Sequence, residues 1–184
     1  MYLLIWDKKE TPMTEKTSKK TIYSISDPFF RFWYRFVPNN MTPITSGRME
    51  RIYEKAVRAN LNDYMGLIFE KMCVEYLLNY SEDTDYQLID IGQWWGTDNV
   101  EKKQVQIDLV GTTDKKDEYL IGSCKFKNEV IGIDELELLK KYATVFGKGK
   151  RYYYYIFSKG GFTEGLRDAA NRGEVKLITL DDMY

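Results

Sequence analysis

Histidine is absent from this sequence of 184 residues, and cysteine and proline are scarce, with two and four residues. Without histidine, the chain cannot form Ser-His or Cys-His nucleophile pairs, and most zinc sites are excluded. The two cysteines, Cys73 and Cys124, supply neither a disulfide framework nor a CxxC site, and their apolar neighbours predict small core side chains. We therefore expect a reduced, cytosolic (cytoplasmic) protein.

Long hydrophobic runs and a strong charge of one sign are also missing. No stretch approaches the roughly 20 apolar residues that a membrane-spanning helix needs, and the apolar start at residues 2–6 lacks the basic leader of a signal peptide. No GxxxxGK[ST] loop occurs, so this chain alone is not expected to be a P-loop nucleotide hydrolase. The net charge of −1 gives no overall attraction to nucleic acid, so any basic surface must be local.

The first third of the chain is predicted to lie outside the main domain. Residues 1–20 contain a polar string that predicts an arm or connector, and we expect them to be the end of a shortened segment. Asp27 and Pro28 predict the start of a helix that Pro38 stops. The aromatic residues of this helix favour burial against the main body over a base-stacking platform. With a second helix capped by Thr45 or Ser46, residues 21–61 are predicted to form a helical extension.

Residues 62–184 show alternating helix and strand patterns, which predict one α/β domain with a mixed sheet. The hydrophobic spacing and turn residues predict, in order, a helix at 63–79, a strand at 87–95, a strand pair at 105–127, a helix after a capping box of Asp134 and Glu137, a strand at 151–158, a helix at 163–172 and a strand at 175–180. The tyrosine-rich strand at 151–158 is predicted to be an inner strand that is covered on both faces.

The strand pair at 105–127 places charged residues among apolar ones. Its polar turn at residues 114–117 sets a register in which Asp108 lies opposite Ser123, with Lys125 diagonally across. Strict alternation would put Asp108 and Val110 on one face and Ile107 and Leu109 on the other. We therefore expect a carboxylate and an ammonium group on one face of the pair.

Glu70 is the second unusual carboxylate. On a helix, its neighbours one turn away are small or apolar, and a charge on such a face costs several kcal/mol unless a cation or donor meets it. Two interpretations follow. Either Glu70 belongs to a functional site, or it forms a structural ion pair, for example with Lys125.

Together these residues suggest chemistry that does not need histidine. Glu70 and Asp108 could hold Mg²⁺, which prefers oxygen ligands, and Lys125 could steer a water or stabilise charge at phosphorus. A basic rim could hold phosphates, although such residues are equally typical of plain surface. The rim candidates are Lys127, Lys140, Lys141, Lys148, Lys150 and Arg151.

An Asp on one strand, an acid-x-Lys pattern on the next and an upstream helical Glu resemble the PD-(D/E)xK restriction-endonuclease-like pattern. The chain further resembles the uncharacterised domain found C-terminal to archaeal-type P-loop ATPases. Four segments carry that resemblance: YSISDPFFRFWYRFV (23–37), GLIFEKMCVEYL (66–77), IGQWWG (91–96) and QIDLV with GSCKF (106–126).

The resemblance implies a restriction-endonuclease-like core at 62–184, with a mixed central sheet flanked by helices and an α-rich N-terminal extension. It also implies a Mg²⁺- or Mn²⁺-dependent DNA endonuclease, with Glu70 and Asp108 as metal ligands beside the carbonyl of Cys124, and Lys125 as a catalytic residue. A P-loop ATPase domain, in cis upstream or in trans, is the implied partner.

One position departs from the family pattern. Two residues before Lys125 the resemblance requires Glu or Asp, and this chain has Ser123, a poorer ligand for Mg²⁺. Another acid could take its place, and the candidates are Glu118, Glu129, Asp134 and Glu135. The alternatives that follow are an active nuclease, an inactive nuclease-fold module that binds DNA or docks on the ATPase and regulates it, and a structural role in which Glu70 and Lys125 neutralise each other.

Overall fold

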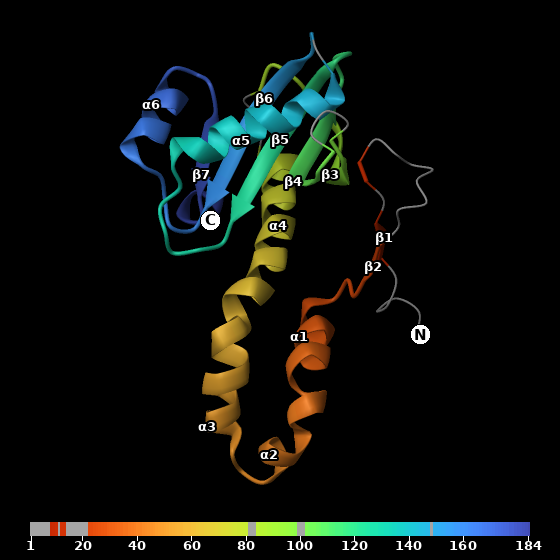
Figure 1. The fold of residues 1–184 in the computed structure, drawn as a ribbon, viewed down its shortest axis with the longest axis vertical. Coiled ribbons are helices and arrows are strands. Elements are labelled where there is room, and N and C mark those ends of the chain that lie inside the picture. Colours follow the sequence, from red (N-terminus) through yellow and green to blue (C-terminus); the bar gives the residue numbers. More distant parts are fainter. Residues whose placement is uncertain (1–7, 11, 14–21, 81–83, 99–101, 148) are drawn as a thin grey trace.

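The computed structural model describes residues 8–10, 12–13, 22–80, 84–98, 102–147 and 149–184. Within these residues the chain forms a mixed α/β domain with a central sheet, and a helical arm extends away from it (Figure 1). This agrees with the predicted order of helix, three strands, helix, strand, helix and strand. Most of the predicted connector at 1–20 lies outside the described residues.

The central sheet has five strands in the order of the sequence, from β3 to β7. Neighbours are antiparallel from β3 to β5 and parallel from β5 to β7, so the sheet is mixed, as predicted. A separate two-stranded sheet pairs β1 with β2. The strands are β1 (Lys8–Glu10), β2 (Ile22–Ser24), β3 (Leu88–Thr97), β4 (Gln104–Thr113), β5 (Glu118–Lys125), β6 (Arg151–Ser158) and β7 (Lys176–Thr179).

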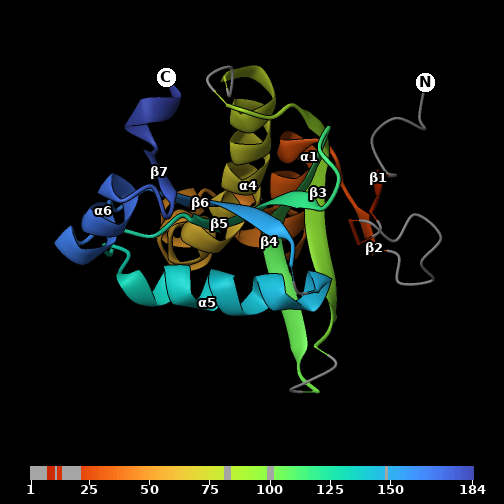
Figure 2. The same ribbon diagram turned by 90° about the horizontal axis from the view of Figure 1, so that it is seen from above.

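The longer helices cover both faces of this sheet, with α4 on one face and α5 on the other (Figure 2). The helices of the domain are α4 (Leu61–Tyr80), α5 (Ile133–Ala143) and α6 (Glu164–Asn171), with the 3₁₀ turns η4 (Thr144–Phe146) and η5 (Asp181–Met183). Those of the arm are α1 (Pro28–Phe36), η1 (Pro38–Asn40), α2 (Met41–Thr45), α3 (Met49–Ile52), the π-helical η2 (Tyr53–Val57) and η3 (Arg58–Asn60).

The core consists of one apolar cluster on each face of the sheet. On the α5 face, Ile121 and Ile156 pack with Leu136 of α5 and Leu166 of α6. On the α4 face, Phe69, Cys73 and Leu77 pack with strand residues that include Tyr155 and Phe157. The tyrosine-rich β6 therefore lies between two strands and two layers, which confirms the prediction for that strand.

The arm confirms some local predictions and corrects others. Asp27 caps α1, because its Oδ1 accepts hydrogen bonds from the backbone N–H groups of Phe29 and Phe30 at 2.8 and 3.1 Å, and the helix ends before Pro38. The expected burial of its aromatic residues is wrong in part. Phe36 is buried, but Phe29 and Trp33 are 64% and 43% exposed, because α1 packs on α4 with one side only.

Two expected helix caps are wrong. Thr45 ends α2 and Ser46 follows it, whereas α3 begins after Arg48, which makes no side-chain capping bond. The residue before α5 is Gly132, so Asp134 lies inside the first turn and forms no capping box with Glu137. The arm also runs into α4 without an intervening loop, so the division at residue 61 stays a prediction.

Candidate functional site

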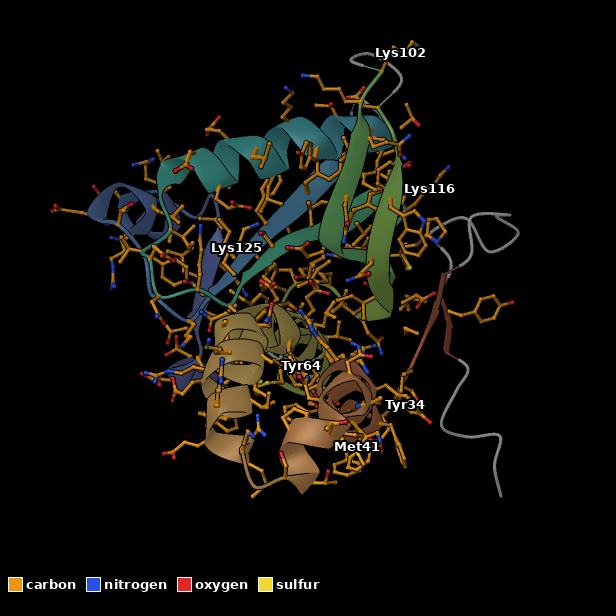
Figure 3. All side chains as sticks on the ribbon, turned by 60° about the horizontal axis from the view of Figure 1, so that its bottom comes forward. Tyr34, Met41, Tyr64, Lys102, Lys116 and Lys125 are labelled. Carbon is orange, nitrogen blue, oxygen red and sulfur yellow. The ribbon has the colours of Figure 1, made fainter. Side chains whose placement is uncertain are left out.

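The predicted motif residues lie where β4 and β5 separate. The β4–β5 ladder runs from Thr112 opposite Tyr119 to Leu109 opposite Gly122, so Asp108 and Ser123 come next in register, as predicted. Beyond this point β4 stays paired with β3, while β5 stays paired with β6 through Lys125 opposite Ser158. The two strands thus form a fork with Asp108 on one branch and Lys125 on the other (Figure 3 labels Lys125).

A β-bulge lies at the same point of β4. Gly92 pairs with Val110 and Trp94 with Ile107, so Asp108 and Leu109 both lie opposite Gln93. Strict alternation is therefore wrong here, because Ile107 and Val110 both pack in the α5-face cluster while Leu109 packs in the α4-face cluster. Bulges commonly redirect a side chain beside a functional site.

Four side chains meet in the fork, and we call them the Asp108 cluster: Asp108, Ser123, Lys125 and Glu135. The Oδ2 of Asp108 accepts a 2.9 Å hydrogen bond from the Cys124 N–H and lies 3.3 Å from the Ser123 hydroxyl. That hydroxyl lies 2.7 Å from Oε1 of Glu135, and Lys125 Nζ lies 3.1 Å from the same oxygen. The sequence therefore predicted three of the four members, and Glu135 was one of four acids left open.

The Asp108 cluster is only partly exposed to water. Ser123 is 2% exposed, and the side chains of Glu135 and Lys125 are 14% and 29% exposed. Burial raises the pKa of the Asp108 carboxyl, against the lowering effects of the Cys124 N–H and the Lys125 ammonium. Burial acts to lower the pKa of Lys125, but the carboxylates of Asp108 and Glu135 outweigh it and raise that pKa. With both carboxyl groups ionised, two carboxylates and one ammonium give the cluster a formal charge of −1.

Glu70 approaches the fork from α4. Its Oε2 accepts a hydrogen bond from the side-chain amide of Gln93, the β3 residue opposite the bulge. The carboxylates of Glu70 and Asp108 both act on the Cys124 thiol, whose pKa is raised chiefly by burial, then by its contact with Cys73, and further by these two charges. Lys125 forms its ion pair with Glu135, and not with Glu70 as the structural alternative had it.

Three of the four candidate acids do not join the Asp108 cluster. Glu118 lies at the opposite end of β5 and accepts a hydrogen bond from Tyr153 at 2.6 Å, and Glu129 and Asp134 are exposed. Among the rim lysines, Lys127 and Lys141 are exposed. Lys140 instead forms ion pairs with Glu137 and Glu174 at 3.0 and 2.9 Å, which leaves it less able to hold a phosphate.

Two residues of the site escaped the sequence analysis. Gln93 lies within the IGQWWG segment, so the motif itself was the signal that could have found it. Ser158 lies beside Lys125 in the β5–β6 register, and its hydroxyl is the buried side-chain polar atom without a hydrogen-bond partner within the described part of the chain. An ordinary serine that ends an apolar strand gives no sequence signal of this kind.

Two loops brace the end of the fork and the start of α5. Ile131 forms a bridge with Phe162, and the Thr163 N–H donates to the Ile131 carbonyl at 2.9 Å. Gly160 approaches so closely that a Cβ at this position would collide with the backbone oxygens of Asn128 and Glu129. The loop after Lys125 is therefore held against the loop after Ser158, and α5 begins from this joint.

Among the residues described, no three His, Cys, Asp or Glu side chains lie grouped closely enough to hold a metal ion. Over the same part of the chain, no helix has the length and apolar character needed to cross a membrane. The Asp108 cluster does offer the oxygen donors that Mg²⁺ prefers, namely two carboxylates and a hydroxyl beside the Cys124 peptide.

Comparison with known proteins places the chain in a family. Residues 33–141 match DUF234, described as archaea bacterial proteins of unknown function, and the chain belongs to this family. The matched residues include α4, the fork and most of α5, so they contain the whole Asp108 cluster and Glu70.

The chain is also similar to two individual proteins. An uncharacterised protein of Methanocaldococcus jannaschii is 29% identical over 178 residues, which cover 95% of this chain. The chain spans 38% of that relative's length. The crystal structure of AF1548, a protein of unknown function, is similar at 18% identity with a TM-score of 0.39, over 61% of this chain and 58% of that one.

Proposed function

We propose that this chain is a nuclease-like domain that hydrolyses a phosphodiester bond of DNA with the help of a divalent metal ion. The observation that carries the proposal is the Asp108 cluster, in which a strand carboxylate and a strand lysine meet at a fork between β4 and β5. This arrangement, on an α/β core with an upstream helical Glu70, is what the resemblance to PD-(D/E)xK proteins implies.

Each residue has a distinct part in this proposal. Asp108 would bind Mg²⁺ or Mn²⁺ together with the carbonyl of Cys124, and Glu70 would add a second carboxylate from α4. A bound metal polarises the phosphodiester and lowers the pKa of a coordinated water. Lys125 would orient the attacking water or stabilise the charge that develops on the phosphate oxygens. When both of its carboxyl groups are ionised, the Asp108 cluster carries a formal charge of −1, which also favours a cation.

The electrostatic setting supports a role in binding rather than in packing alone. Lys125 and Glu135 are partly buried, with side chains 29% and 14% exposed, and withdrawing such charges from water has a cost that their attraction must offset. Apolar side chains of similar size would often be as stable or more stable. A charged cluster at a strand fork is therefore better explained by chemistry than by stability.

The test is a comparison of DNA cleavage by matched variants. Supercoiled and linear DNA are incubated with the purified chain and with Mg²⁺ or Mn²⁺. We expect metal-dependent nicking that is abolished by Asp108→Ala and by Lys125→Ala. Lys116→Ala is the control, because Lys116 is exposed in the turn at the far end of the same strand pair (Figure 3). If no DNA substrate is cut with either metal, the domain is not a nuclease.

A non-catalytic module is the second candidate, and the serine in place of the motif acid favours it. In that case the fork would bind DNA or dock on an ATPase without cleaving anything. Calorimetry separates the two, because the natural chain would then bind no Mn²⁺ and Ser123→Glu would introduce binding. Binding by the natural chain that Asp108→Ala removes would count against this candidate.

The ATPase partner is a separate part of the proposal. It is supported by the resemblance to the domain that follows archaeal-type P-loop ATPases, and the longer M. jannaschii relative leaves room for such a domain. We propose that a P-loop ATPase acts with this domain, either in the same chain or as a separate protein. Co-elution of the chain with such an ATPase in size-exclusion chromatography tests it, and two separate peaks at micromolar concentration would contradict it.

A further inference from the structure

We infer that Glu135 of α5 supplies the carboxylate that the strand position 123 lacks, so that the acid of the site has moved from β5 to the neighbouring helix. This inference rests on the proposed function, since it names a further ligand of the same metal site. It assigns to Ser123 the part of a hydroxyl that joins the two acids, rather than that of a defect.

The inference rests on the contacts of Ser123. Its hydroxyl lies 2.7 Å from Glu135 and 3.3 Å from Asp108, so one small side chain lies between two carboxylates. A serine has a single O–H to donate, and it cannot satisfy both acids fully. The two carboxylates therefore lie close together and share one donor, which is an arrangement that a divalent cation stabilises by neutralising both.

The size of residue 123 explains how Glu135 reaches this place. Ser123 is almost fully buried, and its Oγ occupies the position where a longer side chain would continue from Cβ. A Glu at 123 would bring a second carboxyl group beside that of Glu135, which the Ser123 hydroxyl now contacts. The short side chain of Ser123 and the long side chain of Glu135 thus complement each other. The cluster keeps the carboxylate that the strand position lacks, now supplied by the helix.

The start of α5 determines which acid can enter. Glu135 lies in the first turn, and its N–H donates to the carbonyl of Gly132 at 3.2 Å. Its neighbour Asp134, which would carry the same charge, is exposed, because successive helix residues point about 100° apart. Leu136 on the other side is completely buried in the core. Only Glu135 among these three combines an acidic side chain with the direction of the fork.

A purely structural role for Glu135 makes a different prediction. If it served only to neutralise Lys125, its removal would lower stability and leave metal affinity unchanged. The ion pair with Lys125 uses one oxygen of Glu135, and the Ser123 hydroxyl contacts that same oxygen. Metal binding, measured apart from cleavage, therefore distinguishes the two roles.

The experiment measures Mn²⁺ binding by isothermal titration calorimetry for the full chain and four variants, and thermal unfolding of each protein without metal reports its folding. Glu135→Gln keeps the size of the side chain and is expected to lower Mn²⁺ affinity about tenfold or more. Asp134→Asn is the matched control, since it removes the same charge from the same helical turn at an exposed position. There we expect a change of less than about twofold, because exposed charges are screened by salt.

Moving the acid back tests the inference in the opposite direction. Ser123→Glu combined with Glu135→Ala places one carboxylate on the strand and removes the one on the helix. We expect this double variant to regain Mn²⁺ affinity to within about threefold of the natural chain, and to restore any cleavage that Glu135→Ala alone has lost.

The outcomes separate this inference from the proposed function. If the natural chain binds no Mn²⁺, the metal site itself is wrong and the inference falls with it. If the natural chain binds Mn²⁺ and Glu135→Gln binds it equally well, only the assignment of Glu135 is overturned. A folded double variant that fails to recover binding also counts against the transfer of the acid from strand to helix.

Discussion

The sheet domain and the helical arm both contain many aromatic residues, but they place them differently. In the domain, Tyr155 and Phe157 of β6 are buried beneath α4, whereas in the arm Phe29 and Trp33 of α1 face outward. Both segments would be expected to bury such side chains if the hydrophobic effect acted within this chain alone. The difference indicates that the fold of the domain depends on its aromatics, while the arm is attached through a small set of contacts on one side.

The largest expected effect on stability comes from replacing a phenylalanine of the domain, compared with the same replacement in the arm. Phe157→Ala should lower the free energy of unfolding by about 3–5 kcal/mol, because it leaves a cavity between β6 and α4. Phe29→Ala should change it by less than about 0.5 kcal/mol, since that ring is mostly exposed. Urea denaturation followed by circular dichroism measures both. Equal losses would show that the arm also buries its aromatics in solution.

The next effect concerns the attachment of the arm to α4. Tyr64 lies where α4 meets α1 (Figure 3), donates a hydrogen bond to the Pro28 carbonyl at 2.5 Å and packs edge-on against Phe32 and Phe36. Tyr64→Ala should weaken this contact by about 3 kcal/mol, and Tyr64→Phe by about 1 kcal/mol through the lost hydrogen bond.

Amide hydrogen exchange shows which elements lose stability when Tyr64 is replaced. In Tyr64→Ala, the amides of α1 should lose protection, while those of β5 and β6 should keep theirs. A uniform loss throughout the sheet would contradict the view that the arm and the domain are held by separate contacts.

A smaller effect is expected inside the domain, where two buried serines lie on neighbouring strands. Ser123→Ala removes a hydroxyl that contacts two carboxylates and should cost about 1.5–3 kcal/mol, the range for hydrogen bonds to charged groups. Ser158→Ala removes a hydroxyl without a partner within the described residues, and should change stability by less than about 0.5 kcal/mol. Thermal unfolding at neutral pH measures both, and the reverse order would show that Ser158 gains a partner in solution.

The smallest expected effect is at the start of the arm. Asp27 accepts two backbone hydrogen bonds at the first turn of α1, so Asp27→Ala should cost about 1 kcal/mol. The loss should be confined to exchange of the amides of Phe29 and Phe30 and their neighbours. Asp27→Asn is the control, because asparagine caps helices about as well as aspartate.

The parts of this molecule that could be predicted are those set by local chemistry. The turn after β4 determined the register, so Asp108 and Ser123 were correctly placed opposite each other. Alternation along β5 correctly put Ser123 and Lys125 on one face. The order of helices and strands followed from hydrophobic periodicity, which changes clearly between the helical and the extended segments.

The parts that could not be predicted depend on neighbours distant in sequence. The bulge at Asp108 and Leu109 arises from the pairing of β4 with β3, and the sequence of β4 alone does not predict it. The choice of Glu135 depends on where α5 begins, and that start follows from Gly132 and the adjoining loops rather than from the expected cap at Asp134. The exposure of Trp33 was not predicted, because the spacing of apolar residues along a helix does not show whether another element covers that side of the helix.

Gly160 gives the site a dependence on a residue that carries no chemical group. Because two backbone oxygens from residues 128 and 129 occupy the space where its side chain would begin, any larger residue must push the two loops apart. That displacement would move the first turn of α5, and with it the acid that reaches into the fork. A methyl group at residue 160, outside the cluster, would therefore change the distance between the carboxylates of the cluster. The geometry of the site depends in part on the absence of a side chain at Gly160.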